Sequence, residues 1–202
     1  GAMVSLGRPP TDPTSDWVIL VRPADAGRVR PSPPPEPVAA SPAGSKKVPG
    51  HPVLEDAYLE NGVGHNSSHL KVEPGRRVAY LKVDLSHSPV GAIGATLELT
   101  AHGDPGRGTL LVHRAAGNSW SEKNLNPDNA PASGAVIGRH RGPVGDGETI
   151  TIDVTSLLGG QKTESLVLSM EAGGNDIWFS SKTGPHPPRL LFVTEDAAPN
   201  LR

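Results

Sequence analysis

The chain has 202 residues, of which Gly and Pro make about 23%, roughly twice their usual share in soluble proteins. This composition favours short strands and tight turns over long helices. The chain lacks Cys, which excludes disulfides and thiol chemistry, and it has no apolar run approaching the roughly 18 residues of a membrane helix. Residues 53–196 carry 12 Lys and Arg against 17 Asp and Glu, a net charge of −5, so we expect no nucleic-acid partner and no membrane partner.

The first 52 residues do not have the pattern of a folded domain. Residues 1–21 begin with Gly-Ala-Met, which resembles a scar left by tag cleavage, and contain DWVILV at 16–21. That short apolar run is a possible strand, belonging either to a preceding domain or to the edge of this one. Residues 22–52 are rich in Pro, which fixes φ and removes a donor, so they should be extended and coreless. We interpret them as a linker; a docking site for a Pro-binding partner is the alternative.

The domain proper is predicted at 53–196, followed by a tail at 197–202. Its clearest element is RRVAYLKVDL at 76–85. The strict alternation of its side chains marks a half-buried strand. We expect one face of this central strand to be buried (Leu81, Val83 and Leu85) and the other to meet water (Tyr80, Lys82 and Asp84).

Further short strands are predicted on both sides of this one, with turn residues between them. Asn61–Gly62 should form a tight turn, one helical turn is expected at 155–158 with Asp153 or Thr155 as its cap, and residues 116 to about 138 should be irregular. Eight to ten strands at this spacing predict an antiparallel β-sandwich of the jelly-roll type. The strands follow in the order 53–60, 69–72, 76–85, 93–101, 109–114, 148–154, 166–170, 176–180 and 189–193.

Six motifs in the same order resemble the DNRLRE-type domain, which is also classed as carbohydrate-binding module family 96. They are DAYLENG at 56–62, RRVAYLKVDLS at 76–86, GATLELT at 94–100, SWSEKNLNPDNAPA at 119–132, IDVTSLL at 152–158 and NDIWFSSKTG with PPRLLFV at 175–193. The resemblance covers about 140 residues. It implies a β-jelly-roll module, typically attached to secreted bacterial enzymes that act on polysaccharides such as alginate, and also found in large surface proteins.

The candidate binding face combines two strands. In DIWFS, at 176–180, alternation predicts that Ile177 and Phe179 are buried and that Trp178 faces out. Aromatic rings stack on sugar C–H faces, while Lys and Arg bind carboxylates or sulfates. If the strands are neighbours, an acidic polysaccharide could bind there; otherwise Trp178 covers the edge of the sandwich and the lysines are solvated. The predicted ligand-binding residues of this face are Arg76, Arg77, Tyr80, Lys82, Trp178 and Lys182.

The irregular stretch at 116–138 offers a second candidate. Trp120, Lys123 and Asn124 could contact a sugar at the rim. The alternative is a structural role in which Trp120 pins the loop onto the core, and the sequence favours this alternative.

A structural calcium ion is a weaker possibility. Glu55 and Asp56, with Asp176 or Asp196, could supply hard oxygen ligands, but no fixed ligand spacing is present. His65 and His69 are four residues apart, yet Gly64 and the NSS between them predict a loop, and we expect exposed polar histidines rather than metal ligands.

Nothing in the sequence indicates an enzyme, because no nucleophile elbow, HExxH pair or phosphate loop is present. We therefore predict a non-catalytic, secreted or cell-surface bacterial module that binds an acidic, algal-type polysaccharide. Its partners would be that polysaccharide and a catalytic domain of the same parent chain, a polysaccharide-degrading enzyme. The alternative is a structural spacer or adhesion module without a sugar ligand.

Overall fold

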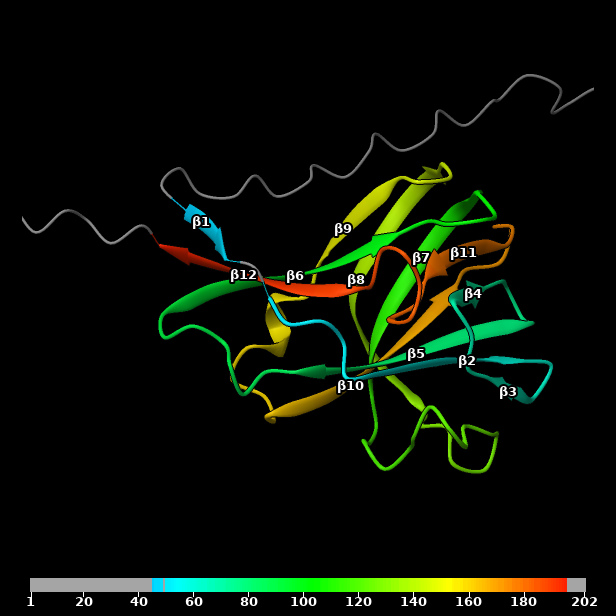
Figure 1. The fold of residues 1–202 in the computed structure, drawn as a ribbon, viewed down its shortest axis with the longest axis horizontal. Coiled ribbons are helices and arrows are strands. Elements are labelled where there is room, and N and C mark those ends of the chain that lie inside the picture. The colour runs from blue at the N-terminus through cyan, green and yellow to red at the C-terminus, as the bar shows by residue number, and fades with distance from the viewer. Residues whose placement is uncertain (1–44, 49, 196–202) are drawn as a thin grey trace, which may run out of the picture. The chain divides into compact units, whose positions relative to one another are not determined.

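The computed structural model of the protein describes residues 45–48 and 50–195, which form antiparallel strands in three sheets (Figure 1). The first sheet has the order β3 (Val63–His65), β2 (Glu55–Glu60), β5 (Arg77–Asp84), β10 (Thr163–Met170), β7 (Gly106–Ala115) and β8 (Ser133–Val144). The second has the order β1 (Ser45–Val48), β12 (Arg189–Glu195), β6 (Ala92–Thr100) and β9 (Thr149–Asp153). A separate pair is formed by β4 (His69–Val72) and β11 (Ile177–Ser180), and one 3₁₀ turn, η1 (Thr155–Leu157), follows β9.

The two large sheets share one apolar core, as the predicted antiparallel β-sandwich requires. Alternate side chains of the inner strands point inward, so Leu81 of β5, Leu97 of β6 and Phe192 of β12 are fully buried in the same cluster. The chain passes from one sheet to the other between β5, β6 and β7, a connectivity found in sandwiches with Greek-key connections. The predicted fold class is confirmed. No helix in residues 45–48 or 50–195 is long and apolar enough to cross a membrane.

The hairpin turn follows the sequence, but the cap of η1 does not. Asn61 and Gly62 have φ of 49° and 80°, the left-handed values that a two-residue hairpin turn demands at both central positions. The predicted cap of η1 is wrong, because the N-cap residue is Val154, which makes no side-chain cap hydrogen bond. Asp153, one residue earlier, accepts a hydrogen bond from the Thr155 amide at 2.8 Å. The expected burial of Ile177 and Phe179 is confirmed.

The central strand β5 has the predicted inner face but not the predicted outer face. Leu81 and Val83 are buried in the core, whereas Tyr80 and Lys82 on the opposite face are only 7% and 9% exposed. The expectation that Tyr80 and Lys82 meet water is therefore wrong. Strand alternation separates the two faces of a strand, but it does not reveal that a loop covers the second face.

The covering element is the loop of residues 116–132, which lies against the outer face of the six-stranded sheet, below β2, β5 and β10 in Figure 1. Trp120 and Leu125 of this loop pack against Tyr80 of β5, and the cluster includes Ala57 and Val167. The indole N–H of Trp120 donates to Ser165 Oγ at 2.9 Å. The favoured structural role of Trp120 is thus confirmed, and its alternative role as a rim contact for sugar is wrong because the ring is 2% exposed.

Three strands lie where none was predicted (β1, β3 and β8), and the twelve strands of the described residues exceed the expected eight to ten. Strand β3 forms at Val63–His65, where a loop was expected. Strand β1 falls within the predicted linker at 22–52 and pairs with β12, so the sandwich begins before residue 53. Strand β8 begins in the last part of the predicted irregular stretch, continues beyond it to Val144, and pairs only with β7. An edge strand tolerates Pro143 and several glycines because one side of its backbone needs no partner. The run at 16–21, the rest of the linker to residue 44 and the tail at 197–202 lie outside the described residues.

We predict that Trp120→Ala lowers the free energy of unfolding by about 3–5 kcal/mol, because it empties the centre of the cluster under the loop. Chemical denaturation followed by circular dichroism measures the loss. The matched control is Lys123→Ala, which changes an exposed side chain of the same loop and should leave stability within about 0.5 kcal/mol. A stable Trp120→Ala variant would show that the loop does not depend on this contact.

Candidate functional site

Lys82 directs its charge inward, so it is not a ligand-facing cation in this structure. Its ammonium donates to Glu55 Oε1 and to the carbonyl oxygen of Trp120, each at 2.7 Å. It also lies 5.0 Å from the centre of the Trp120 ring. A buried cation needs such partners because desolvation is costly. Lys82 therefore joins β2 and β5 to the loop of residues 116–132.

Lys182 plays a similar part on the other side of β2. Its ammonium donates to Glu122 Oε2 at 2.7 Å and to the Leu54 carbonyl at 3.0 Å, while its amide donates to Asp56 Oδ2 at 2.6 Å. The Glu122 amide in turn donates to Glu55 at 2.9 Å. We call Glu55, Asp56, Lys82, Glu122 and Lys182 the loop clamp.

The two acids of the loop clamp on β2 titrate differently because their surroundings differ. Burial opposes ionisation of both. For Asp56, which is 1% exposed, burial dominates and raises the pKa to about 6. For Glu55, burial acts in the same direction, but hydrogen bonds from Lys82 and the Glu122 amide outweigh it and hold the pKa below its ordinary value.

Trp178 does not share a face with Tyr80, because β11 pairs with β4 and not with β5. The indole N–H donates to Asp176 at 2.7 Å. The Lys71 ammonium lies 3.5 Å from the centre of its ring, and His69 contacts the ring from the side. The predicted combination of a tyrosine–lysine row with a tryptophan–lysine row on one open surface is therefore wrong.

The two predicted arginines at the start of β5 sit among acids. Arg77 contacts Glu60 at 2.7 Å, Glu73 at 3.2 Å and also Asp176, and its side chain is 11% exposed. Arg76 is more exposed and reaches Glu60 at 3.0 Å. These ion pairs neutralise both guanidinium groups locally, so neither extends a cationic patch.

The acids proposed as calcium ligands are held apart. Glu55 pairs with Lys82, whereas Asp176 pairs with Arg77, and five residues of an extended strand separate these partners by about 17 Å. Asp196 lies outside the described residues. Within the described ranges no group of three or more His, Asp or Glu side chains could hold a metal ion. A structural calcium ion stays a prediction.

The histidines are not in a loop as expected. His65 lies in β3 and stacks on Tyr58 with ring centres 4.9 Å apart, while His69 lies in β4 and stacks on His102 at 5.4 Å. Both are half-buried, so the prediction of exposed loop histidines is wrong.

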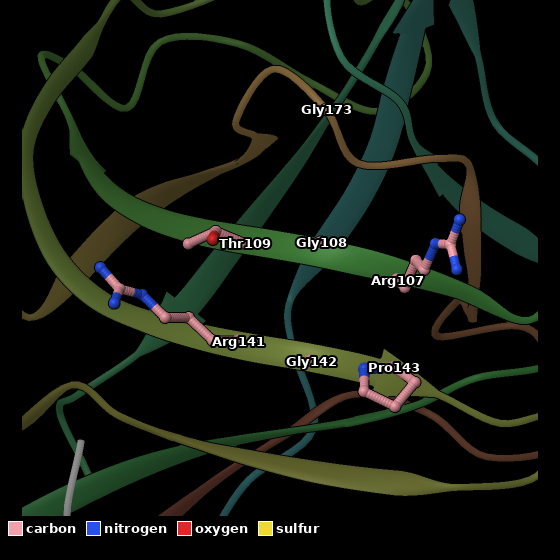
Figure 2. A pocket seen from close by; sticks show the side chains of 7 residues that line it. All are labelled: Arg107, Gly108, Thr109, Arg141, Gly142, Pro143 and Gly173. Atoms are coloured by element: carbon pink, nitrogen blue, oxygen red, sulfur yellow. The ribbon is translucent and has the colours of Figure 1, made fainter. Parts of the chain in front are cut away.

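A surface groove that the sequence did not indicate lies on β7 and β8, with a volume of about 360 Å³. Gly108 pairs with Gly142 at its centre, and Figure 2 shows Arg107 and Arg141 at opposite ends. A side chain at position 108 would meet Gly174 Cα at 2.8 Å, so this position requires glycine. We call this the arginine groove; its lining is completed by Thr109, Pro143 and Gly173.

The arginine groove carries exposed positive charge. Arg107 and Arg141 are exposed, and neither takes part in an ion pair among the described residues. Arg139, also exposed, lies two residues before Arg141 on the same side of β8, a spacing of about 7 Å. The alternating cations of the Arg-His-Arg run at 139–141 were the available sequence signal. It was missed because no strand was predicted between residues 114 and 148.

Comparison of the sequence with models of known protein families gives a match that covers the β-sandwich. The sequence model of carbohydrate-binding module family 96 matches residues 55–195, which include every described strand except β1. No curated protein matches the chain.

The buried Asp56 generates a pH prediction. Its pKa is raised from 3.8 to about 6 on folding, so its contribution to stability is fully present below about pH 4 and is lost as pH rises through 6. We expect Asp56→Asn to remove this component, so that the stability difference between wild type and variant changes between pH 4 and 7. Denaturant titrations across that range measure the difference.

The control for this experiment is Asp128→Asn, a change of an exposed acid in the loop, whose difference from wild type should stay flat. An equally flat difference for Asp56→Asn would mean that the carboxylate of Asp56 is not held in a desolvated site.

Proposed function

The chain belongs to carbohydrate-binding module family 96, and from this premise we propose that it binds an acidic polysaccharide through the arginine groove. Members of carbohydrate-binding module families bind sugars without catalysing a reaction, so the chain is a non-catalytic binding module. The observation that carries the acidic preference is the set of three exposed arginines on β7 and β8 that no acid neutralises among the described residues.

Guanidinium groups suit this ligand class chemically. Each presents a planar fork of donors that matches a carboxylate or sulfate in a bidentate arrangement. Arg107 and Arg141 stand at the two ends of the groove (Figure 2), so successive acidic groups of a chain could meet them in turn. Arg139 would extend the same row along β8.

The groove is formed by one face of two paired strands. Arg107, Thr109 and Arg141 share that face because they alternate with the cross-strand partners Gly108 and Gly142. The groove is an open surface feature and not an enclosed cavity. Such a shape suits an internal stretch of a polymer better than a small molecule.

The net charge of the rest of the domain would limit attraction of an acidic polysaccharide to short distances. Residues 53–196 have a net charge of −5, and the loop clamp and the Arg77 cluster keep other cations paired with acids. Long-range attraction of a polyanion would therefore be weak. Binding would depend on short-range contacts that added salt screens.

We further propose that the module is secreted or exposed on the cell surface and belongs to a parent chain with a polysaccharide-degrading domain. By holding that domain near its substrate, the module would raise the local substrate concentration. A spacer or adhesion role without a sugar ligand is the alternative. It is favoured because the described residues show no open aromatic platform: Tyr80 and Trp120 are buried, and Lys71 lies over Trp178.

We predict that alginate, ulvan or carrageenan in a native gel slows migration of the protein and that added salt weakens the effect. Arg107→Ala and Arg141→Ala should each weaken binding by roughly ten- to a hundredfold, since a hydrogen bond to a charged group is worth about 1.5–3 kcal/mol. Affinity electrophoresis over a range of polysaccharide concentrations gives the dissociation constants.

Arg76→Ala is the matched control, because it removes an exposed arginine that is already paired with Glu60. Conservative Arg107→Lys and Arg141→Lys variants separate charge from bidentate geometry. Equal weakening by Arg76→Ala would refute the arginine groove, and unretarded migration on all three polysaccharides would favour the spacer alternative.

A further inference from the structure

A second cleft lies on the other sheet of the sandwich, on residues that the arginine groove does not use. Its volume is about 230 Å³. The strands β6, β9 and β12 form its base, and the segment before β12 forms its wall. We call it the threonine cleft; it is lined by Glu98, Thr100, Thr149, Pro185, His186, Pro187 and Arg189.

Strand alternation and register place the polar side chains of the threonine cleft on the outer face. Glu98 and Thr100 of β6 alternate with Leu97 and Leu99, which are fully buried. Glu98 pairs with Arg189 of β12, and Thr100 pairs with Thr149 of β9. Directly paired residues share one face of a sheet, so these four side chains form one polar surface.

The polar groups on this surface keep hydrogen-bonding capacity that their neighbours do not use. Glu98 and Arg189 are cross-strand partners of opposite charge, yet neither forms an ion pair anywhere in the described part of the chain. The Thr100 and Thr149 hydroxyls are 2.9 Å apart. Such a pair uses one proton, so one hydroxyl proton and several lone pairs stay available. The cleft thus offers donors and acceptors together.

The wall of the threonine cleft, residues 185–187, is fixed by a contact with the buried Ser180. The His186 amide donates to Ser180 Oγ at 3.0 Å, and Ser180 is fully buried. A side chain at Gly184 would come within 2.4 Å of the same Ser180 oxygen, so the turn depends on glycine. Pro185 and Pro187 restrict φ on both sides of His186. The His186 ring also meets His102 edge-on, with centres 6.5 Å apart.

We propose that the threonine cleft is a second carbohydrate subsite and that it takes a neutral sugar residue. Sugar hydroxyls donate and accept at once, which matches the mixture of Glu98, Arg189 and threonine hydroxyls. Proline and histidine rings provide a partly apolar wall for sugar C–H groups. The charge of Glu98 offsets that of Arg189, so the cleft has no net attraction for an acidic sugar, which separates this site from the arginine groove. The inference rests on carbohydrate binding by the family and not on the arginine groove.

The test is a titration of isotopically labelled protein, followed by amide NMR shifts. The probes are neutral hexasaccharides of β-1,4-glucose, β-1,4-mannose, β-1,4-xylose and β-1,3-glucose. We expect at least one to shift amides of the threonine cleft, with an affinity that 0.5 M salt leaves nearly unchanged. The double variant Arg107→Ala/Arg141→Ala should bind it equally well, so failure of the arginine groove would not affect this result.

Variants then locate the site. Glu98→Ala and Thr149→Ala should weaken the hexasaccharide roughly tenfold, the loss expected for one or two hydrogen bonds. Thr151→Ala is the matched control because Thr151 is an exposed threonine of β9 that pairs with Glu98 but does not line the cleft. The proposal is overturned if none of the four sugars shifts any amide, if the shifts fall on the arginine groove, or if Thr151→Ala weakens binding as much as Thr149→Ala.

Discussion

The buried ammonium of Lys82 is the constraint on which the rest of the surface depends. It stands on the outer face of the central strand and is 9% exposed, so it must find partners inside the protein. Glu55 supplies a carboxylate, and the loop of residues 116–132 supplies the carbonyl of Trp120. A covering loop without this acceptor would leave the buried charge with too few partners, so the contact fixes how the loop lies on the sheet. Around this contact the second apolar cluster forms, with Tyr80 and Trp120 at its centre.

Because the loop covers β2, β5 and β10, a ligand has access only to other parts of the described surface. The outer face of the six-stranded sheet is left open towards β7 and β8, where the arginine groove lies. On the other sheet, the polar row of β6, β9 and β12 carries the threonine cleft. Cations near the loop are held by acids, as Lys182 is by Glu122 at 2.7 Å, whereas those of the groove are exposed. Pairing with acids thus distinguishes the cations that hold the fold together from the exposed arginines that we propose as ligand contacts.

The sequence predicted correctly those features that depend on one strand or turn alone. The alternation of residues 76–85 identified the inner face of β5 correctly, and Asn61–Gly62 identified a hairpin turn. It failed where the outcome depends on which segments meet. Alternation cannot show that a loop covers Tyr80, nor that β11 pairs with β4. Strand β8 escaped notice because an edge strand with several glycines and Pro143 needs no apolar period, and the arginines of the groove were missed with it.

The two proposed sites lie on the outer faces of two sheets that share one core, so they face away from each other. Packed sheets are about 10 Å apart, so the two sites open in opposite directions. A short oligosaccharide would therefore occupy one site at a time, and a module with both sites filled by such ligands would hold two of them. Each site would keep its own response to salt, because guanidinium contacts are screened and hydroxyl contacts are not. A mixed polysaccharide matrix, with acidic and neutral chains side by side, is the substrate on which such a division would raise avidity beyond that of either site.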